Sequence, residues 1–294
     1  MSEVQIAIPY WGDPQLLIRA VDSVLQQDDD RWRLVVIDDC YPDSTVREYM
    51  ATIRDGRVSY VRNDENIGIT ANFRKAVALA DADYVCVMGS DDLLLPGYVA
   101  VILAAASAHP DADIIQPGVR VVDADGVASR PLADRVKAVL APRGAGPTTL
   151  QGELLAASLL RGNWLYWPSL AFKTSTIRRF DFRDDLAVIQ DLAILIDIAF
   201  AEGTLVYTPR DAFLYRRHDA SASQSALTDG TRFADERRYY DEARRGAQSR
   251  GWDRAARAAR WRVMSRLHAL TELPRAVRSG HRGAVRACLD HVFR

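Results

Sequence analysis

The first third of the chain alternates short apolar runs with amphipathic stretches. The runs at residues 4–9, 34–37, 58–61 and 84–88 are rich in Val and Ile, as buried strands are. Between the first two runs, Leu17, Ala20, Val21, Val24 and Leu25 recur at helical spacing, directly after an Asp and a Pro. Asp is favoured at a helix N-cap and Pro in the first helical turn, so this stretch predicts a helix.

The alternation predicts an α/β protein with a mostly parallel central sheet flanked by helices on both faces. Ligands of such sheets bind beyond the carboxyl ends of the strands. The segments that follow the apolar runs are therefore the places to look for a site. They are polar or turn-forming, and they span residues 9–12, 38–43, 63–68 and 89–92.

The second half is less regular. Residues 130–149 are rich in Pro, Gly, Ala and Arg, so we expect a connecting loop there. Helices are expected near residues 153–160 and 191–201, and short strands near residues 205–207 and 213–216. From Thr231 onward the Ala- and Arg-rich sequence predicts two or three helices, with breaks near Gly251, Pro274 and Gly280.

Charge is unevenly distributed along the chain. Residues 231–294 hold 16 of the 38 Lys and Arg residues and 7 of the 39 Asp and Glu residues, so this region carries +9 and the remainder −10. A basic region beside an acidic body favours contact with an anionic surface, either phospholipid headgroups or a polyanionic acceptor. A solvated helical face with locally paired arginines explains the pattern equally well.

The cysteines and the apolar stretches of the sequence predict the cellular compartment. The three cysteines are scattered without CxxC spacing, which argues against a disulfide framework or a zinc site and favours a reducing compartment. The N-terminus lacks the pattern of a secretory signal, and residues 99–108 are shorter than the roughly 20 residues of a spanning helix. We expect a cytoplasmic protein, with peripheral contact at the inner face of the cell membrane as the finer alternative.

Two pairs of adjacent aspartates follow apolar runs. Asp91 and Asp92 stand in the motif GSDD after YVCVM, where paired carboxylates could hold a hard divalent cation that binds a phosphate. Asp38 and Asp39 follow LVVI and could accept a hydrogen bond from a base or ribose. The alternative for either pair is local structure, with Asp as a helix cap or the start of an Asx turn.

Taken in order, several pieces of the chain resemble the inverting GT-A glycosyltransferases of family 2. They lie between residues 4 and 223 and read AIPYWG, VVIDDCYPDST, NDENIGITANFRKA, DYVCVMGSDDLLLPGY, IQDLAIL and YRRHDASAS. The resemblance implies a GT-A fold, to which the predicted helices after Thr231 add a C-terminal extension. It also implies transfer of a hexose or deoxyhexose from a UDP, dTDP or GDP sugar to a hydroxyl of a glycan, lipid-linked or cell-surface polysaccharide acceptor.

The same resemblance implies an organisation and a donor site. Residues 1–115 would be the nucleotide-sugar-binding half, 116–230 the acceptor-binding and catalytic half, and 231–294 the basic helical extension. The donor-binding residues that it implies are Pro9 and Trp11 lining the base pocket, Asp39 recognising the base, and Asn66 and Arg74 along the nucleotide and pyrophosphate. Cys40 stands where the family frequently has Gly.

A metal site is implied next. Asp92 would be the main protein ligand of Mn²⁺ or Mg²⁺, and Asp91 would touch ribose or metal. His218 would complete the metal shell or contact the diphosphate, and Arg216 or Arg217 would offset the charge of the leaving group.

The catalytic base implied by the resemblance is Asp191, in VIQDLAIL. An acceptor hydroxyl is a poor nucleophile at neutral pH, so a positioned carboxylate must take its proton as it attacks the sugar. Spacing alone favours Asp191 as the N-cap of the apolar helix that follows, whereas the resemblance favours it as the base. The aromatic cluster Trp164, Tyr166 and Trp167 could form an acceptor platform or belong to the core.

Other classes of protein receive less support. A GT-A-like domain that binds sugar nucleotide or glycan without turnover is the main alternative, and the joint presence of Asp92, Asp191 and His218 favours the enzyme. No known nucleic-acid module is visible in the Arg-rich region, so we expect no nucleic-acid partner. GAG at residues 144–146 does not follow a strand, and a GxxxxGK phosphate loop is missing.

Overall fold

The computed structural model describes residues 2–186, 189–217, 231–278 and 282–293. The expected alternation of strands and helices in the first third is confirmed. Asp13 caps the first helix, because its Oδ1 accepts a hydrogen bond from the Gln15 amide at 2.7 Å. The elements are β1 (Val4–Tyr10), α1 (Pro14–Leu25), β2 (Trp32–Asp38), α2 (Thr45–Thr52), β3 (Val58–Arg62), α3 (Ile69–Ala78) and β4 (Tyr84–Val87).

The second half contains more regular structure than its composition suggests. The prediction of a loop over residues 130–149 is wrong, since a helix and a strand form there. The two short strands expected near residues 205–216 are one continuous strand. The elements are β5 (Leu93–Leu94), α4 (Tyr98–Ala108), β6 (Ile114–Val122), α5 (Leu132–Leu140), β7 (Thr148–Gln151), α6 (Gly152–Arg161), the 3₁₀ turn η1 (Trp167–Ser169), β8 (Ala171–Lys173), α7 (Thr174–Ile177), α8 (Gln190–Phe200) and β9 (Thr204–Arg216).

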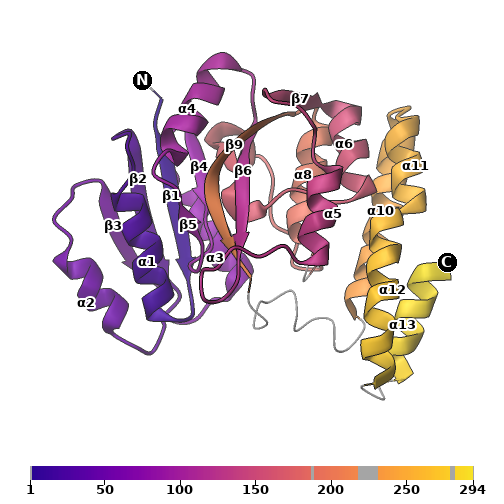
Figure 1. Cartoon of the computed structure of the whole chain (residues 1–294), viewed down its shortest axis with the longest axis horizontal. Coiled ribbons are helices and arrows are strands. Elements are labelled where there is room, and N and C mark those ends of the chain that lie inside the picture. The colour runs from indigo at the N-terminus through magenta and orange to yellow at the C-terminus, as the bar shows by residue number, and fades with distance from the viewer. Residues whose placement is uncertain (1, 187–188, 218–230, 279–281, 294) are drawn as a thin grey trace.

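One mixed sheet runs through the molecule in the order β3-β2-β1-β4-β8-β6-β9-β5, and β7 pairs with β9. Strands β3, β2, β1 and β4 are parallel, as expected, whereas β8 lies antiparallel between β4 and β6. Tyr10 pairs with Asp38, and Asp38 pairs with Arg62, so β1, β2 and β3 end level with one another. Their polar following segments therefore share one edge (Figure 1).

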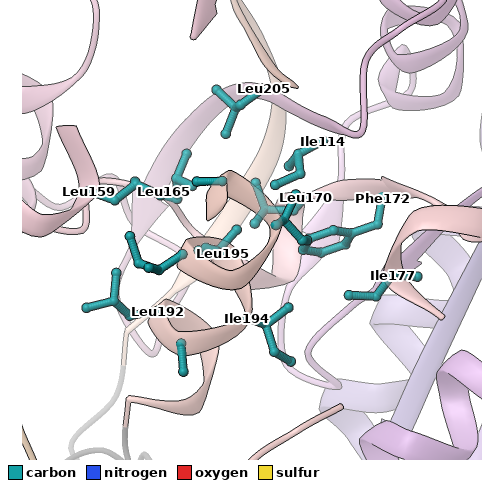
Figure 2. Packing of buried hydrophobic residues seen from close by; sticks show 14 of the residues in the cluster. Ile114, Leu159, Leu165, Leu170, Phe172, Ile177, Leu192, Ile194, Leu195 and Leu205 are labelled. Carbon is teal, nitrogen blue, oxygen red and sulfur yellow. The ribbon is translucent and has the colours of Figure 1, made fainter. Parts of the chain in front are cut away.

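Helix α8 lies at the centre of the larger core. Figure 2 shows Leu192, Ile194 and Leu195 of this helix packed among Phe172 and Leu205 from the sheet. A helix that is apolar all round must be covered on every side. Its first turn, which carries Asp191, is thereby fixed relative to the sheet.

The C-terminal region forms α10 (Thr231–Ser249), α11 (Asp253–Trp261), α12 (Val263–Arg278) and α13 (Arg282–Phe293), at the right of Figure 1. The break between α11 and α12 falls at Arg262, whose φ of 34° is left-handed, and Pro274 lies inside α12 without ending it. Gly280 lies outside the described residues. The expected break at Pro274 is wrong because α12 continues through the proline.

Helices α10 and α11 are part of the main core. Tyr239 and Tyr240 of α10 and Ala255 and Ala259 of α11 belong to the same buried cluster as α8. Helices α12 and α13 instead enclose a small cluster of their own around Phe233. Among the described helices, none is long and apolar enough to cross a membrane.

Candidate active site at the carboxyl edge of the sheet

Asp39 organises the loop that precedes α3. It is buried, and its carboxylate accepts hydrogen bonds from the Asn63 amide at 2.7 Å and from the backbone N–H groups of Ile67 and Gly68, both at 2.9 Å. A carboxylate has about four acceptor positions, so three donors leave one on Oδ2. The predicted contact with a base therefore has one acceptor position available.

The neighbours of Asp39 are structural. Asp38 is buried and accepts from the Tyr41 amide at 2.8 Å and from Arg62 at 2.5 Å. Cys40 has a φ of 62°, in the left-handed region that favours glycine, which explains why Gly suits this position. This strained turn directs the chain away from β2 just after the carboxylate of Asp39.

Exposed apolar side chains lie on the segments next to Asp39 in the fold. Trp11 is 51% exposed at the end of β1 and meets the Tyr41 ring edge-on, with the ring centroids 5.2 Å apart. Ile67 and Ile69 are 39% and 54% exposed on the loop that Asp39 holds. Large apolar side chains exposed beside a buried carboxylate are suited to cover a flat heterocyclic base.

The remaining predicted donor-binding residues differ in their contacts. Pro9 is half-buried in β1, and exposed Asn66 accepts the Gly68 amide at 3.1 Å, so it helps form the turn before α3. Arg74 is bound by Asp181 at 2.6 Å and by Asp184 at 2.9 Å. In this arrangement its guanidinium ties α3 to residues 181–184, and its predicted contact with pyrophosphate would require exchange of these partners.

The acidic motif after β4 does not cap a helix. Leu93 and Leu94 form β5 instead, and α4 begins only at Tyr98. Asp92 is buried, and its Oδ1 accepts the Arg216 backbone N–H at 2.8 Å. The Arg216 side chain donates to the Asp91 carbonyl at 2.9 Å, so β9 holds both aspartates in place.

Gly89 leaves space where both carboxylates point. A Cβ at this position would lie 2.6 Å from Asp92 Oδ2 and 3.1 Å from Asp91 Oδ1. Burial and the Asp91 carboxylate raise the pKa of Asp92 well above its ordinary value, and a nearby cation would favour the ionised carboxylate. Both carboxylates thus have an oxygen near one position beside glycine, and carboxylate oxygens are the ligands that a small divalent cation prefers.

Further ligands for a cation at Asp91 and Asp92 are not found among the described residues. His218 lies outside the described residues. Within residues 2–186, 189–217, 231–278 and 282–293, no group of three His, Cys, Asp or Glu side chains is arranged to hold a metal ion. The metal roles of Asp92 and His218 therefore stay predictions.

Asp191 lies in the first turn of α8, where helix amino termini favour negative charge. The N-cap is Ile189, so the alternative in which Asp191 caps the helix is wrong. Its Oδ2 accepts a hydrogen bond from Asn163 Nδ2 at 3.2 Å. An amide donor of this kind orients a carboxylate without neutralising it, as a general base requires.

A polar cluster that the sequence did not reveal lies beside Asp191. Buried Asp134 of α5 accepts hydrogen bonds from the Tyr166 hydroxyl at 2.9 Å and from Arg217 Nη2 at 2.8 Å. Lys137, one turn later, lies over the Tyr166 ring at 4.2 Å and donates to the Leu165 carbonyl. A signal existed in the helical spacing of LADRVKAVL, which the Pro- and Gly-rich flanks obscured.

Electrostatic coupling links this cluster to both acidic sites. Burial lowers the pKa of Lys137 to about 8, Asp191 and Asp134 oppose this shift, and Arg217 adds to it. Burial raises the pKa of Tyr215 to about 12, and the carboxylates of Asp92, Asp91 and Asp134 act in the same direction.

The loop that Asp39 holds and the helix of Asp191 are also joined directly. Thr70, two residues after the glycine that Asp39 holds, donates to Gln190 Oε1 at 3.3 Å. Segments from distant parts of the sequence therefore meet at the carboxyl edge of the sheet. They bring together the surroundings of Asp39, of Asp91 and Asp92, and of Asp191.

The aromatic cluster divides between core and site. Trp164 is 2% exposed and bonds Ser158 at 3.1 Å, and Trp167 packs on Phe172. Tyr166 faces the polar cluster, with its ring 5.2 Å from that of Tyr215. Trp164 and Trp167 therefore belong to the core. Tyr166 is the member of the cluster that lies near the site.

One cavity, of about 660 Å³, opens at the opposite end of the parallel strands. Its lining includes Glu3, Arg31, Asp83, Lys173 and Arg178. The predicted site residues do not line it. Glu3 and Arg31 each form an ion pair with another side chain, Lys173 and Arg178 bond backbone carbonyls, and the cavity takes no part in the arrangement described above.

Comparison with known proteins identifies the class. The family model of glycosyl transferase family 2 matches residues 5–156, which include the Asp39 loop and the GSDD motif. The chain belongs to glycosyl transferase family 2, a family of sugar-transferring enzymes. WcaA of Escherichia coli, whose name links it to colanic acid biosynthesis, is 35% identical over 102 residues, covering 34% of this chain and 37% of that protein.

A longer match and a solved structure extend the comparison. The succinoglycan biosynthesis protein ExoO of Rhizobium meliloti is 25% identical over 227 residues, covering 76% of this chain and 63% of that protein. The crystal structure of S. aureus TarS 1–349 superposes with a TM-score of 0.67 at 13% identity, covering 90% of this chain and 72% of that one. This match confirms the expected GT-A fold, including the C-terminal helices. The matched regions leave a large part of WcaA and ExoO uncovered.

Proposed function

We propose that the chain is an inverting hexosyl- or deoxyhexosyltransferase that moves a sugar from a nucleotide donor to a hydroxyl of a glycan or lipid-linked acceptor. One observation carries the proposal. A loop organised by Asp39, a pair of converging carboxylates at Asp91 and Asp92, and an oriented carboxylate at Asp191 meet at one edge of the sheet.

Relatives support the substrate classes. TarS, at 14% identity, has been solved in complex with UDP-GlcNAc and, at 13%, with UDP, which favours a nucleotide-sugar donor. ExoO and WcaA are named for succinoglycan and colanic acid biosynthesis, which favours a polysaccharide precursor as acceptor. We assign donor binding to residues 1–115 and acceptor binding to residues 116–230, where Tyr166 and Lys137 would contact an acceptor that reaches Asp191.

Asp92 and Asp91 would hold a Mn²⁺ or Mg²⁺ ion beside Gly89. When bound, such an ion neutralises part of the charge that develops on a departing nucleoside diphosphate. Arg217 is a cation of the chain in this region, and Asp134 holds it through two guanidinium nitrogens. Arg217 would stabilise the same leaving group through charge-assisted hydrogen bonds.

Asp191 would act on the acceptor. Its carboxylate takes the proton of the attacking hydroxyl while Asn163 keeps it oriented, and the acceptor oxygen displaces the diphosphate from the opposite face of the sugar. A single displacement inverts the anomeric configuration. No residue of the chain forms a covalent bond with the sugar in this scheme.

The test compares two aspartates of the same helix. Asp191→Asn should keep donor affinity and lose transfer by about 100-fold or more, the usual contribution of a general base. Asp197→Asn is the control, because Asp197 lies on α8 beside Arg183 and Glu242 and away from this edge. Transfer from a radiolabelled sugar nucleotide and calorimetric donor binding give the two readouts. Undiminished transfer by Asp191→Asn would exclude this residue as the base.

The basic C-terminal region receives a separate assignment. We propose peripheral contact of residues 231–294 with an anionic membrane surface at the inner face of the cell membrane, where a lipid-linked acceptor would be present. The +9 charge of this region supports the contact.

A further inference from the structure

We infer that an exposed apolar stripe on α12 is a docking surface that inserts into the interface of an anionic lipid bilayer. The inference deepens the membrane contact proposed above and rests on it, since it names the surface that makes the contact. It does not depend on the transfer reaction.

The stripe follows helical geometry. Val263, Leu267, Leu270, Pro274 and Val277 recur at steps of four and three residues, so they share one face of the helix. All five are exposed, with values of 45%, 50%, 48% and 59% for the Val and Leu side chains in chain order. We call these five residues the α12 stripe.

The opposite face of α12 already has its partners. Ser265 and Ala269 are buried, and Ala269 packs with Phe233 and Cys288 of the small C-terminal cluster. The α12 stripe is therefore not needed to hold the helix in place. A second apolar face on a helix that is already packed predicts another partner.

Exposed apolar side chains are concentrated in this part of the molecule. Seven of the 15 exposed large apolar residues in the described chain lie between residues 261 and 293. Beyond the α12 stripe they include Trp261 at 57%, Leu289 at 39% and Phe293 at 77%. Trp and Phe are side chains that partition into the headgroup region of a bilayer.

Charge selects the bilayer over a second copy of the chain. Within α12 the charged groups around the stripe are Arg266, Arg275 and Arg278, and the one acid, Glu272, lies 3.9 Å from His268. Two copies packed stripe to stripe would bring arginines against arginines. A surface of anionic lipid headgroups attracts these arginines while its acyl region accepts the stripe.

Placement in the fold agrees with this assignment. In Figure 1, β9 runs downward to the edge where the candidate active site lies, and the α12–α13 pair reaches the same lower end of the molecule. A bilayer at α12 would thus lie toward the end of the sheet at which an acceptor meets Asp191. Docking through the stripe would keep the active site near a membrane-bound acceptor.

The experiment uses the full chain with vesicles of phosphatidylglycerol and phosphatidylcholine, and with phosphatidylcholine alone. We expect sedimentation with the anionic vesicles, weakened by 0.5 M salt, and little with the neutral ones. Leu267→Gln with Leu270→Gln should lower the binding by about tenfold or more, since two half-exposed leucines lose their apolar contact. Leu154→Gln is the control, because Leu154 is 50% exposed on another helix, α6.

Circular dichroism and light scattering complete the test. Unchanged helicity and a monomeric wild type are expected, because all three substituted leucines are exposed. The inference is overturned if the double variant binds anionic vesicles as the wild type does. It is also overturned if the wild type is a dimer that the double variant dissociates, because the stripe would then be a protein interface.

Discussion

Gly89 is the residue at which the geometry of the acidic motif can be tested most directly. In Gly89→Ala, the added methyl would lie 2.6 Å from Asp92 Oδ2 and 3.1 Å from Asp91 Oδ1, well inside normal contact. The Asp92 carboxylate would have to turn, yet its other oxygen is held by the Arg216 backbone N–H at 2.8 Å. To avoid the added methyl, the Asp92 carboxylate must therefore turn and weaken its buried hydrogen bond with Arg216.

The magnitude follows from these two contacts. Turning a side chain about 30° from its preferred rotamer costs about 0.5–1.5 kcal/mol. Leaving the buried Arg216 N–H without its acceptor costs about 1–3 kcal/mol. We expect Gly89→Ala to lower the free energy of unfolding by about 2–4 kcal/mol and to weaken Mn²⁺-dependent binding of nucleotide by about tenfold or more, since both carboxylates are displaced.

The assays are urea unfolding followed by tryptophan fluorescence and calorimetric titration of UDP with and without Mn²⁺. Gly97→Ala is the control, because a Cβ there would meet Arg210 at 3.7 Å, an ordinary contact, and should cost less than about 1 kcal/mol. If Gly89→Ala matched Gly97→Ala in both stability and binding, Asp91 and Asp92 would not converge on the space beside Gly89.

Two further predictions concern groups near the same edge. Lys137 has a pKa lowered from 10.5 to about 8, so between these values the unfolded chain holds more protons and stability should rise with pH. Wild type should therefore gain about 1–3 kcal/mol relative to Lys137→Met between pH 8 and 10 in urea unfolding, and parallel curves would contradict the burial of this amine. Asp39→Asn cannot accept from all three donors at once, so it should cost about 1–3 kcal/mol of stability in addition to weakening UDP binding. Loss of binding with full stability would limit Asp39 to contact with the base.

Local sequence signals account for the parallel half of the fold. The cap at Asp13, the runs of β-branched residues and the helical spacing after them all predict the elements that form. They succeed because these elements are regular and because strands that are close in the sequence, such as β1 and β2, pair with each other. In the second half, β8 is only three residues long and lies antiparallel between two strands far away in the chain. Its pairing depends on contacts that no local pattern encodes, and α5 was hidden by the Pro and Gly residues that flank it.

Some residues of the candidate site could also be predicted from local sequence, and others could not. Carboxylates that directly follow strands, such as Asp39 and Asp92, could be named from position, because parallel strands place their carboxyl ends at one edge. Asp134 and Asn163 could not, since their relevance comes only from spatial approach to Arg217 and Asp191. Asp191 was identified as a candidate base only through the resemblance to a family. Spacing alone favoured it as a helix cap, but the N-cap of α8 is Ile189.

Arg262, with its left-handed φ, lies at the break between α11, which belongs to the main core, and α12, which does not. Shortening the chain to end near Trp261 would remove α12 and α13 and uncover Phe233 of α10, but it would keep Ala255 and Ala259 in the main core. Ending it before Thr231 would instead strip Tyr239 and Tyr240 from around α8 and open the interior to water. A shortened form meant to separate membrane attachment from sugar transfer should therefore be cut after α11, which keeps the main core closed, and should carry a polar residue in place of Phe233.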